Sequence, residues 1–172
     1  TATFYSISNC QEGLSRVTLG NFLIKRVVFE IQEELPNIKH FGTLSPIPGF
    51  RDWFSYLEDV KIKNILGEIP LENISFLKST DLKVGDPRIV SNKEAITKLV
   101  AHYLMNEKNH KQLPINDVCR FHLGNGAIID DIVINANVSE VGLNRSFGVM
   151  VNYLYELKNI EKNHEEYINN IF

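Results

Sequence analysis

The chain has 172 residues, which is enough for one domain with a hydrophobic core and too short for two of comfortable size. Hydrophobic residues make up 44% and charged residues 23%, a balance that is typical of a folded globular protein and excludes a disordered chain. The formal net charge is only -3, with acids scattered among the 18 lysines and arginines, so nucleic acid is excluded as an expected partner.

The first part of the chain predicts a strand, a loop, a helix and a second strand. Residues 2–8 alternate β-branched or aromatic side chains with small ones, which is typical of a strand. Apolar residues then recur at helical spacing over about residues 19–35, and Pro36 ends that helix. Residues 38–44 favour extended backbone. This order indicates a βαβ-like unit, which requires a parallel or mixed sheet covered by helices.

The rest of the chain gives a less regular pattern. Residues 60–90 receive no assignment, because prolines and a glycine interrupt the periodicity there. A tight turn is predicted at residues 122–126, before a strand over residues 127–137. Helices are predicted over residues 50–57, 94–105 and 146–157, and a polar, weakly helical tail follows.

Cysteine spacing and hydropathy predict the compartment. Cys10 and Cys119 are the only cysteines and lie in no spacing that is typical of a zinc or redox site, so we expect a reduced, cytoplasmic location and no metal. No apolar run approaches the roughly 20 residues that span a bilayer, so no membrane partner is expected. The chain opens at Thr1, without a methionine and directly in a strand-like run, and we therefore expect a fragment of a longer protein.

A glycine-marked loop over residues 11–20 leads into the long predicted helix. Free backbone N–H groups at a helix N-terminus, with glycines that let a ligand approach, suit a pyrophosphate. Such loops between a strand and a helix are common, so the spacing by itself favours a plain tight turn.

Two single residues are further candidates for chemistry. Ser45 follows a predicted strand, where open α/β sheets place their ligands, and the Pro46 to Gly49 segment after it would hold it rigidly. His122 alone among the five histidines lies between an aromatic residue and a glycine-rich turn. A turn or cap role for Ser45 and a structural role for His122 are the plainer interpretations, and both stay open at this point.

Five segments taken together resemble the malonyl-CoA decarboxylases, whose catalytic domain has the fold of the GNAT acyltransferase superfamily. The resemblance spans nearly the whole chain and is weakest over residues 60–90. Several long motifs in the right order are more specific than any one of them, and they favour functional roles for Ser45 and His122. The segments are Phe4-Tyr5-Ser6-Ile7-Ser8, Gly20-Asn21-Phe22-Leu23-Ile24-Lys25-Arg26-Val27-Val28, Leu44-Ser45-Pro46-Ile47-Pro48-Gly49-Phe50, Phe121-His122-Leu123-Gly124-Asn125-Gly126-Ala127 and Gly148-Val149-Met150-Val151-Asn152-Tyr153.

The resemblance implies an α/β (α+β) fold, a GNAT-like mixed sheet flanked by helices, for residues 1–172. It also implies that a helical N-terminal domain and the first strands of the sheet are absent from this chain. Ser45 and His122 would be the catalytic pair, and Tyr155 and Asn125 would support them. The residues that would hold the CoA phosphates are Ser15, Arg16, Val17, Thr18, Leu19, Gly20 and Asn21.

The reaction that the resemblance implies is the decarboxylation of malonyl-CoA to acetyl-CoA and CO2. No metal or organic cofactor is expected, because the thioester carbonyl is itself the electron sink and CoA is part of the substrate. The protein would stabilise the enolate and deliver a proton to it, and either Ser45 or His122 could give that proton. A homo-oligomer would form through the helical domain that this chain lacks.

Two alternatives belong to other classes of function. Acyl transfer from CoA to an amine is the common reaction of the GNAT fold, but no motif indicates a base or an acceptor site for it. A non-catalytic acyl-CoA-binding module would need the phosphate loop without the segments around Ser45 and His122. Acetyl-CoA formed from malonyl-CoA without any acceptor would discriminate among the three.

Overall fold

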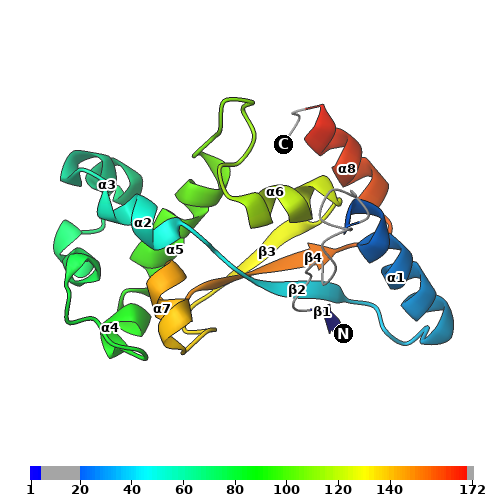
Figure 1. Cartoon of the computed structure of the whole chain (residues 1–172), viewed down its shortest axis with the longest axis horizontal. Helices are drawn as coiled ribbons and strands as arrows, with labels where there is room; N and C mark the ends of the chain where they lie inside the picture. The colour runs from blue at the N-terminus through cyan, green and yellow to red at the C-terminus, as the bar shows by residue number, and fades with distance from the viewer. Residues whose placement is uncertain (5–19, 170–172) are drawn as a thin grey trace, which may run out of the picture. The chain divides into compact units, whose positions relative to one another are not determined.

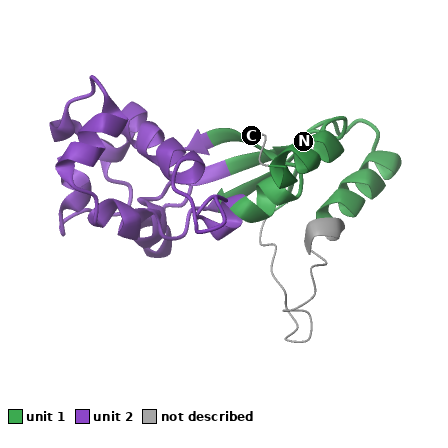
Figure 2. Cartoon of the chain, turned by 90° about the horizontal axis from the view of Figure 1, so that it is seen from above, with its two compact units in different colours: residues 1–45, 120–131, 152–172 green, residues 46–119, 132–151 purple. Residues whose placement is uncertain are grey.

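The computed structural model describes residues 1–4 and 20–169 of the chain (Figure 1). These residues form two compact units, which Figure 2 shows in different colours. Unit 1 consists of Thr1–Ser45, Arg120–Asp131 and Asn152–Phe172, and unit 2 consists of Pro46–Cys119 and Ile132–Val151. Each unit is therefore built from separate segments of the chain. The chain length predicts a single domain, and this remains a prediction alongside the observed division into two compact units.

Among the described residues, four strands form one sheet in the order β1-β2-β4-β3. Strand β1 pairs in parallel with β2, with Ala2 opposite Phe41, and helix α1 connects the two strands. The βαβ-like unit predicted from the sequence is thus confirmed, as is a mixed α/β fold. The strands are β1 (Ala2–Phe4), β2 (Phe41–Pro46), β3 (Ile128–Val133) and β4 (Met150–Tyr155).

Helices α1 (Gly20–Glu34) and α8 (Ile160–Ile168) belong to unit 1. The bounds of α1 confirm the helix predicted over residues 19–35, and α8 confirms the helical tendency of the tail. Lys25 of α1 lies 3.3 Å from Glu161 of α8, so the two helices are neighbours, as their blue and red ribbons show in Figure 1.

Unit 2 is mainly helical, with an aromatic core. Phe50 packs against Trp53 and Tyr103, and Phe147 contacts both Phe50 and Phe54 edge-on at 5.9 and 5.8 Å between ring centres. Helices predicted over residues 50–57 and 94–105 are confirmed. The elements are α2 (Phe50–Ser55), α3 (Asp59–Leu66), the 3-10 helices η2 (Leu71–Asn73) and η3 (Ser75–Lys78), α4 (Pro87–Ser91), α5 (Lys93–Met105) and α7 (Glu140–Ser146).

Residues 60–90, for which the sequence predicts no element, consist largely of short helices. These helices are too short for their apolar residues to show a helical period in the sequence. Pro87, which interrupts the sequence pattern, is the first residue of α4, and the Asp86 side chain caps that helix by accepting a hydrogen bond from the Arg88 backbone N–H at 2.9 Å.

The prediction of a helix over residues 146–157 is wrong. Helix α7 ends at Ser146, and β4 begins four residues later. Phe147 and Gly148 both have positive φ, 56° and 78°, a conformation that ends a helix. Within β4 the buried residues are Val151, Tyr153 and Tyr155, a period of two that defines a strand.

The prediction of a tight turn beginning at His122 is also wrong in its bounds. His122 lies in the last turn of a helix, α6 (Asp117–Gly124), and the turn follows the helix at Gly126, where φ is 80°. The strand predicted after that turn is confirmed as β3, although it is shorter than the predicted 127–137.

Candidate active site

Ser45 lies near the end of β2, as predicted, and its side chain is buried. Successive side chains of a strand point to opposite faces, so Thr43 and Ser45 share a face. The Ser45 hydroxyl donates to Thr43 Oγ1 at 3.2 Å. Pro46 is the last residue of the strand and fixes the backbone directly after the serine.

His122 reaches this strand from α6. Its Nε2 lies 2.9 Å from Ser45 Oγ, and its Nδ1 lies 2.8 Å from the hydroxyl of Tyr155 on β4. The imidazole also stacks on Tyr153, with 4.3 Å between ring centres and 19° between planes. Only 3% of His122 is exposed. The structure therefore brings together the serine, the histidine and the supporting tyrosine that the sequence predicts, all within unit 1.

Burial sets the protonation of this group of side chains. Loss of hydration lowers the pKa of His122 from 6.5 to about 4, so the ring is neutral near pH 7. Burial also raises the pKa of Tyr155 far above its ordinary value, so its hydroxyl keeps its proton. A neutral imidazole has one N–H donor and one acceptor nitrogen.

The tyrosine decides which nitrogen of His122 carries the hydrogen. A buried hydroxyl needs an acceptor for its proton, and within the described chain the hydrogen-bond partner found for the Tyr155 hydroxyl is Nδ1 of His122. Nδ1 is then the acceptor, and Nε2 carries the hydrogen and donates to Ser45 Oγ. The hydrogen bonds accordingly run in one direction, from Tyr155 through His122 and Ser45 to Thr43.

This direction distinguishes the site from a nucleophilic serine site. A histidine that activates a serine must accept the serine proton at one nitrogen, and a carboxylate commonly accepts from its other nitrogen. Here a hydroxyl donates to the other nitrogen, so His122 presents an N–H toward Ser45. The arrangement suits donation of hydrogen bonds, and of a proton, to a ligand that carries negative charge.

Other predicted site residues lie elsewhere. Asn125 is buried just after α6, where its Nδ2 donates to the Phe121 carbonyl at 2.6 Å, a supporting contact for the end of that helix. Gly20 and Asn21 are the first two residues of α1, at the helix N-terminus that the sequence predicts to face the CoA phosphates. The remaining predicted phosphate-binding residues, Ser15, Arg16, Val17, Thr18 and Leu19, lie outside the described residues.

Sequence reasoning missed Thr43 and Tyr153 at this site, and also Asn116 in unit 2. The period-two spacing of Thr43 and Ser45, and of Tyr153 and Tyr155, could have indicated the first two. Asn116 is buried and caps the start of α6, because its Oδ1 accepts from the Cys119 N–H at 2.8 Å. Its Nδ2 donates to the Pro48 carbonyl at 2.9 Å, which ties the start of α6 to the segment that follows Ser45.

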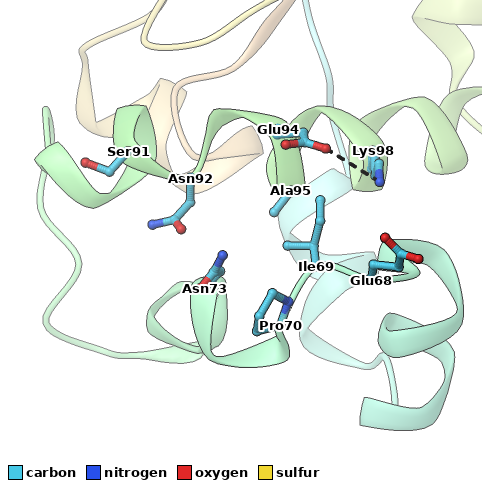
Figure 3. Close-up of a pocket in the computed structure, with 9 residues that line it drawn as sticks. All are labelled: Glu68, Ile69, Pro70, Asn73, Ser91, Asn92, Glu94, Ala95 and Lys98. Carbon is cyan, nitrogen blue, oxygen red and sulfur yellow. Dashed lines mark ion pairs between the residues drawn. The ribbon is translucent and has the colours of Figure 1, made fainter.

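Unit 2 also contains an open pocket of about 400 Å3 (Figure 3). Lys98 in this pocket lies 3.7 Å from Glu94 and donates to the Leu66 carbonyl at 3.3 Å. Because 78% of the Glu94 side chain is exposed, the charges here are solvated and the pocket lacks the dry setting of the Ser45 site. The lining residues are Glu68, Ile69, Pro70, Asn73, Ser91, Asn92, Glu94, Ala95 and Lys98.

Neither a metal cluster nor a membrane helix occurs in the part of the chain that the structure describes. Over residues 1–4 and 20–169, no three side chains of His, Cys, Asp or Glu come together as metal ligands would. No helix among these residues has the length and apolar character needed to cross a bilayer.

Comparison with protein families and curated proteins gives a consistent result. The family model described as "Malonyl-CoA decarboxylase C-terminal domain" matches residues 1–171. The mitochondrial malonyl-CoA decarboxylase of the goose Anser anser anser is 38% identical over 98% of this chain and 37% of its own length. The rat protein of the same name is 40% identical over 97% of this chain and 37% of its own length. The chain thus spans less than two fifths of the length of these relatives.

Solved structures agree with the sequence comparisons. The malonyl-CoA decarboxylase of Rhodopseudomonas palustris is 39% identical with a TM-score of 0.86, over 99% of this chain and 39% of that protein. The one from Cupriavidus metallidurans is 37% identical with a TM-score of 0.78, over 95% of this chain and 44% of that protein. On the match to the family model over nearly its whole length, and on these relatives, the chain belongs to the malonyl-CoA decarboxylase C-terminal domain family.

Proposed function

We propose that this chain carries the catalytic site for the decarboxylation of malonyl-CoA to acetyl-CoA and CO2. The observation that carries the proposal is the buried, directed series of hydrogen bonds from Tyr155 through His122 to Ser45, in a member of this family. Because the chain spans only part of its relatives, the activity is proposed for the full-length protein that contains it.

The chemistry needs a site that stabilises negative charge and supplies one proton. When the bond to the carboxylate breaks, its electron pair moves into the thioester, CO2 leaves and an enolate forms. A proton then adds to the enolate carbon and gives acetyl-CoA. The thioester is the electron sink, so we propose that neither a metal nor an organic cofactor takes part, with CoA present as part of the substrate.

Ser45 and His122 have the donors for both tasks. In our proposal the Ser45 hydroxyl turns from Thr43 to the bound ligand and, with the N–H of His122, donates hydrogen bonds to the carboxylate or the enolate oxygen. Negative charge beside the imidazole favours its protonated form and would raise the pKa of His122 from the low value that burial gives it. The protonated ring could then give its proton to the enolate carbon, directly or through Ser45.

The start of α1 would hold the CoA phosphates. Its first residues, Gly20 and Asn21, have backbone N–H groups without partners inside the helix, and the helix dipole favours an anion there. We propose that these residues act with residues 15–19 of the preceding loop.

The test is incubation of the full-length protein with malonyl-CoA in the absence of an acceptor. Acetyl-CoA and CO2 should appear in equal amounts, and His122→Ala should lower kcat by roughly a hundredfold while CoA affinity changes little. His110→Ala, which replaces an exposed histidine of unit 2, is the matched control. Transfer of the acyl group to an amine, or binding without turnover, would identify an acyltransferase or a binding module instead.

Location and assembly are further parts of the proposal. We propose a cytoplasmic protein that forms a homo-oligomer through residues beyond this chain. The goose and rat relatives have "mitochondrial" in their names, so fractionation of the native cells is the direct check on location. Light scattering of the full-length protein measures its oligomeric state.

A further inference from the structure

The turn that follows His122 has the hydrogen bonds of a Schellman motif. The Ala127 N–H donates to the His122 carbonyl at 3.1 Å, and the Gly126 N–H donates to the Leu123 carbonyl at 2.9 Å. Gly126 has the positive φ of 80° that this motif requires. The carbonyl of Gly124, the last residue of α6, needs a partner from elsewhere.

Two neighbouring side chains of α8 bind the carbonyls of this turn. His164 Nδ1 lies 2.6 Å from the Gly124 oxygen, and Asn163 Nδ2 donates to the Gly126 oxygen at 3.1 Å. Because a carbonyl only accepts, the Nδ1 atom of His164 carries the hydrogen. Helix α8, drawn in red in Figure 1, therefore holds the end of the helix that carries His122.

The backbone contact between the turn and α8 is equally close. A Cβ atom on Gly126 would lie 2.2 Å from the Ile160 carbonyl oxygen, which no real side chain could do without a shift of the backbone. The turn is thus held by two side-chain hydrogen bonds and by direct packing on the first residue of α8. All of these residues belong to unit 1.

We propose that His164 and Asn163 are positioning residues for His122, an inference that rests on the proposed function of that histidine. They fix the turn two to four residues beyond it and thereby set where the imidazole lies relative to Ser45 and Tyr155. An error of about 1 Å in such a group can lower a rate by roughly a hundredfold. A loss of one of the two contacts should therefore lower kcat without changing substrate affinity.

The test exploits the two nitrogen positions of a histidine. An asparagine amide nitrogen takes about the position of Nδ1, and a glutamine amide nitrogen takes about that of Nε2. His164→Ala should lower kcat about tenfold with KM changed less than about twofold. His164→Asn should restore most of the rate and His164→Gln should not. Equal rates for the Asn and Gln variants, or a parent rate for His164→Ala, would overturn the proposal.

Further variants separate folding from positioning. Asn163→Asp keeps the shape of the side chain but removes the donor to Gly126, so kcat should fall in a protein that melts near the parent temperature. Glu165→Ala, an exposed position of the same helix, should keep the parent kcat. If His164→Ala does not fold, the Asn163→Asp rate and the comparison of His164→Asn with His164→Gln decide the outcome.

The 15N resonances of the His122 ring provide a readout that does not need turnover. They should shift in His164→Ala and return in His164→Asn. If the parent protein does not decarboxylate malonyl-CoA, the proposed function is wrong, and unchanged His122 resonances in His164→Ala would then show that the positioning inference is wrong too. If the parent and the His122→Ala variant behave as proposed, failure of the His164 variants counts against the positioning inference alone.

Discussion

At the scale of single residues, the two hydrogen bonds of the His122 ring differ in direction. Nδ1 accepts from Tyr155, whose hydroxyl keeps its proton because burial raises the pKa of Tyr155, and Nε2 donates toward Ser45. A carboxylate in place of the tyrosine would reverse both bonds and make the histidine a base for the serine. The tyrosine hydroxyl is therefore the group that makes this pair a donor site.

Tyr155→Phe tests that role with minimal change in volume. In the parent protein the hydrogen bond donated by the Tyr155 hydroxyl keeps Nδ1 of His122 without a hydrogen. When the hydroxyl is removed, the neutral ring can carry its hydrogen on either nitrogen. We expect kcat to fall about tenfold with little change in KM, and the ring 15N shifts of His122 to show a mixture of tautomers. Tyr56→Phe, at a side chain that is almost fully exposed, is the control. A parent rate in Tyr155→Phe would show that the hydroxyl does not orient the ring.

The low pKa of His122 also predicts a pH dependence of stability. Its pKa is about 4 in the folded chain and 6.5 when hydrated, so between these values the unfolded chain binds more protons. The contribution of His122 to the free energy of unfolding should therefore be fully present above pH 6.5. It should be lost as the pH falls toward 4, a decrease on the order of 3 kcal/mol.

Urea unfolding of the parent and of His122→Gln at several pH values measures this contribution. The parent should lose more stability than the variant between pH 6.5 and 4, because glutamine does not titrate. Parallel curves for the two proteins in that window would mean that His122 titrates normally in the folded chain.

At the scale of elements, α6 is held at both ends. Asn116 caps its start, and the Gly126 turn with α8 holds its end. A short helix of eight residues has little stability of its own, so these end contacts determine where His122 lies.

Gly126→Ala should destabilise the protein by at least about 2 kcal/mol, from its positive φ and from the clash with the Ile160 carbonyl. Gly85→Ala is the matched control, because Gly85 also has a positive φ, 72°, but a Cβ atom added there would meet no other atom within 4 Å. Thermal or urea unfolding measures both. Equal losses of stability would assign the whole effect to backbone conformation and none to the packing of the turn on α8.

The first residue of α1 gives a prediction about substrate affinity. Gly20→Val places a β-branched side chain at the helix start that we propose for the CoA phosphates. We expect KM for malonyl-CoA to rise more than kcat falls, because the phosphates lie away from the bond that breaks. Steady-state kinetics measure both constants, and an unchanged KM would place the phosphates elsewhere.

At the scale of the whole molecule, the site depends on three separate segments of unit 1. Ser45 ends the first segment, His122 lies in the second and Tyr155 in the third. The chain leaves unit 1 between them and returns twice, and the residues in between form unit 2. No single continuous piece of unit 1 therefore contains the site, and its geometry exists only when all three segments are folded together.

Local patterns in the sequence were sufficient to predict the long elements, whereas the choice of candidate site residues came from the family resemblance. The helices at residues 19–35 and 94–105 extend over three turns or more, so their apolar period was visible, and α1 and α5 confirm them. The family resemblance pointed to Ser45 and His122, which lie 77 positions apart in sequence and are hydrogen-bonded in the structure. Membership of the family is confirmed over nearly the whole chain.

Tertiary structure decided the elements around the site and the chemistry of its groups. His122 lies at the end of a helix and Tyr155 on a strand because their neighbours in space bury them there, whereas the local sequence favoured a turn and a helix. The lowered pKa of His122 arises from loss of hydration, which depends on atoms from distant segments. Contacts with α8, more than 35 positions along the chain, hold the turn after His122. Sequence periodicity reports only neighbours within a few residues, so it could predict none of these contacts.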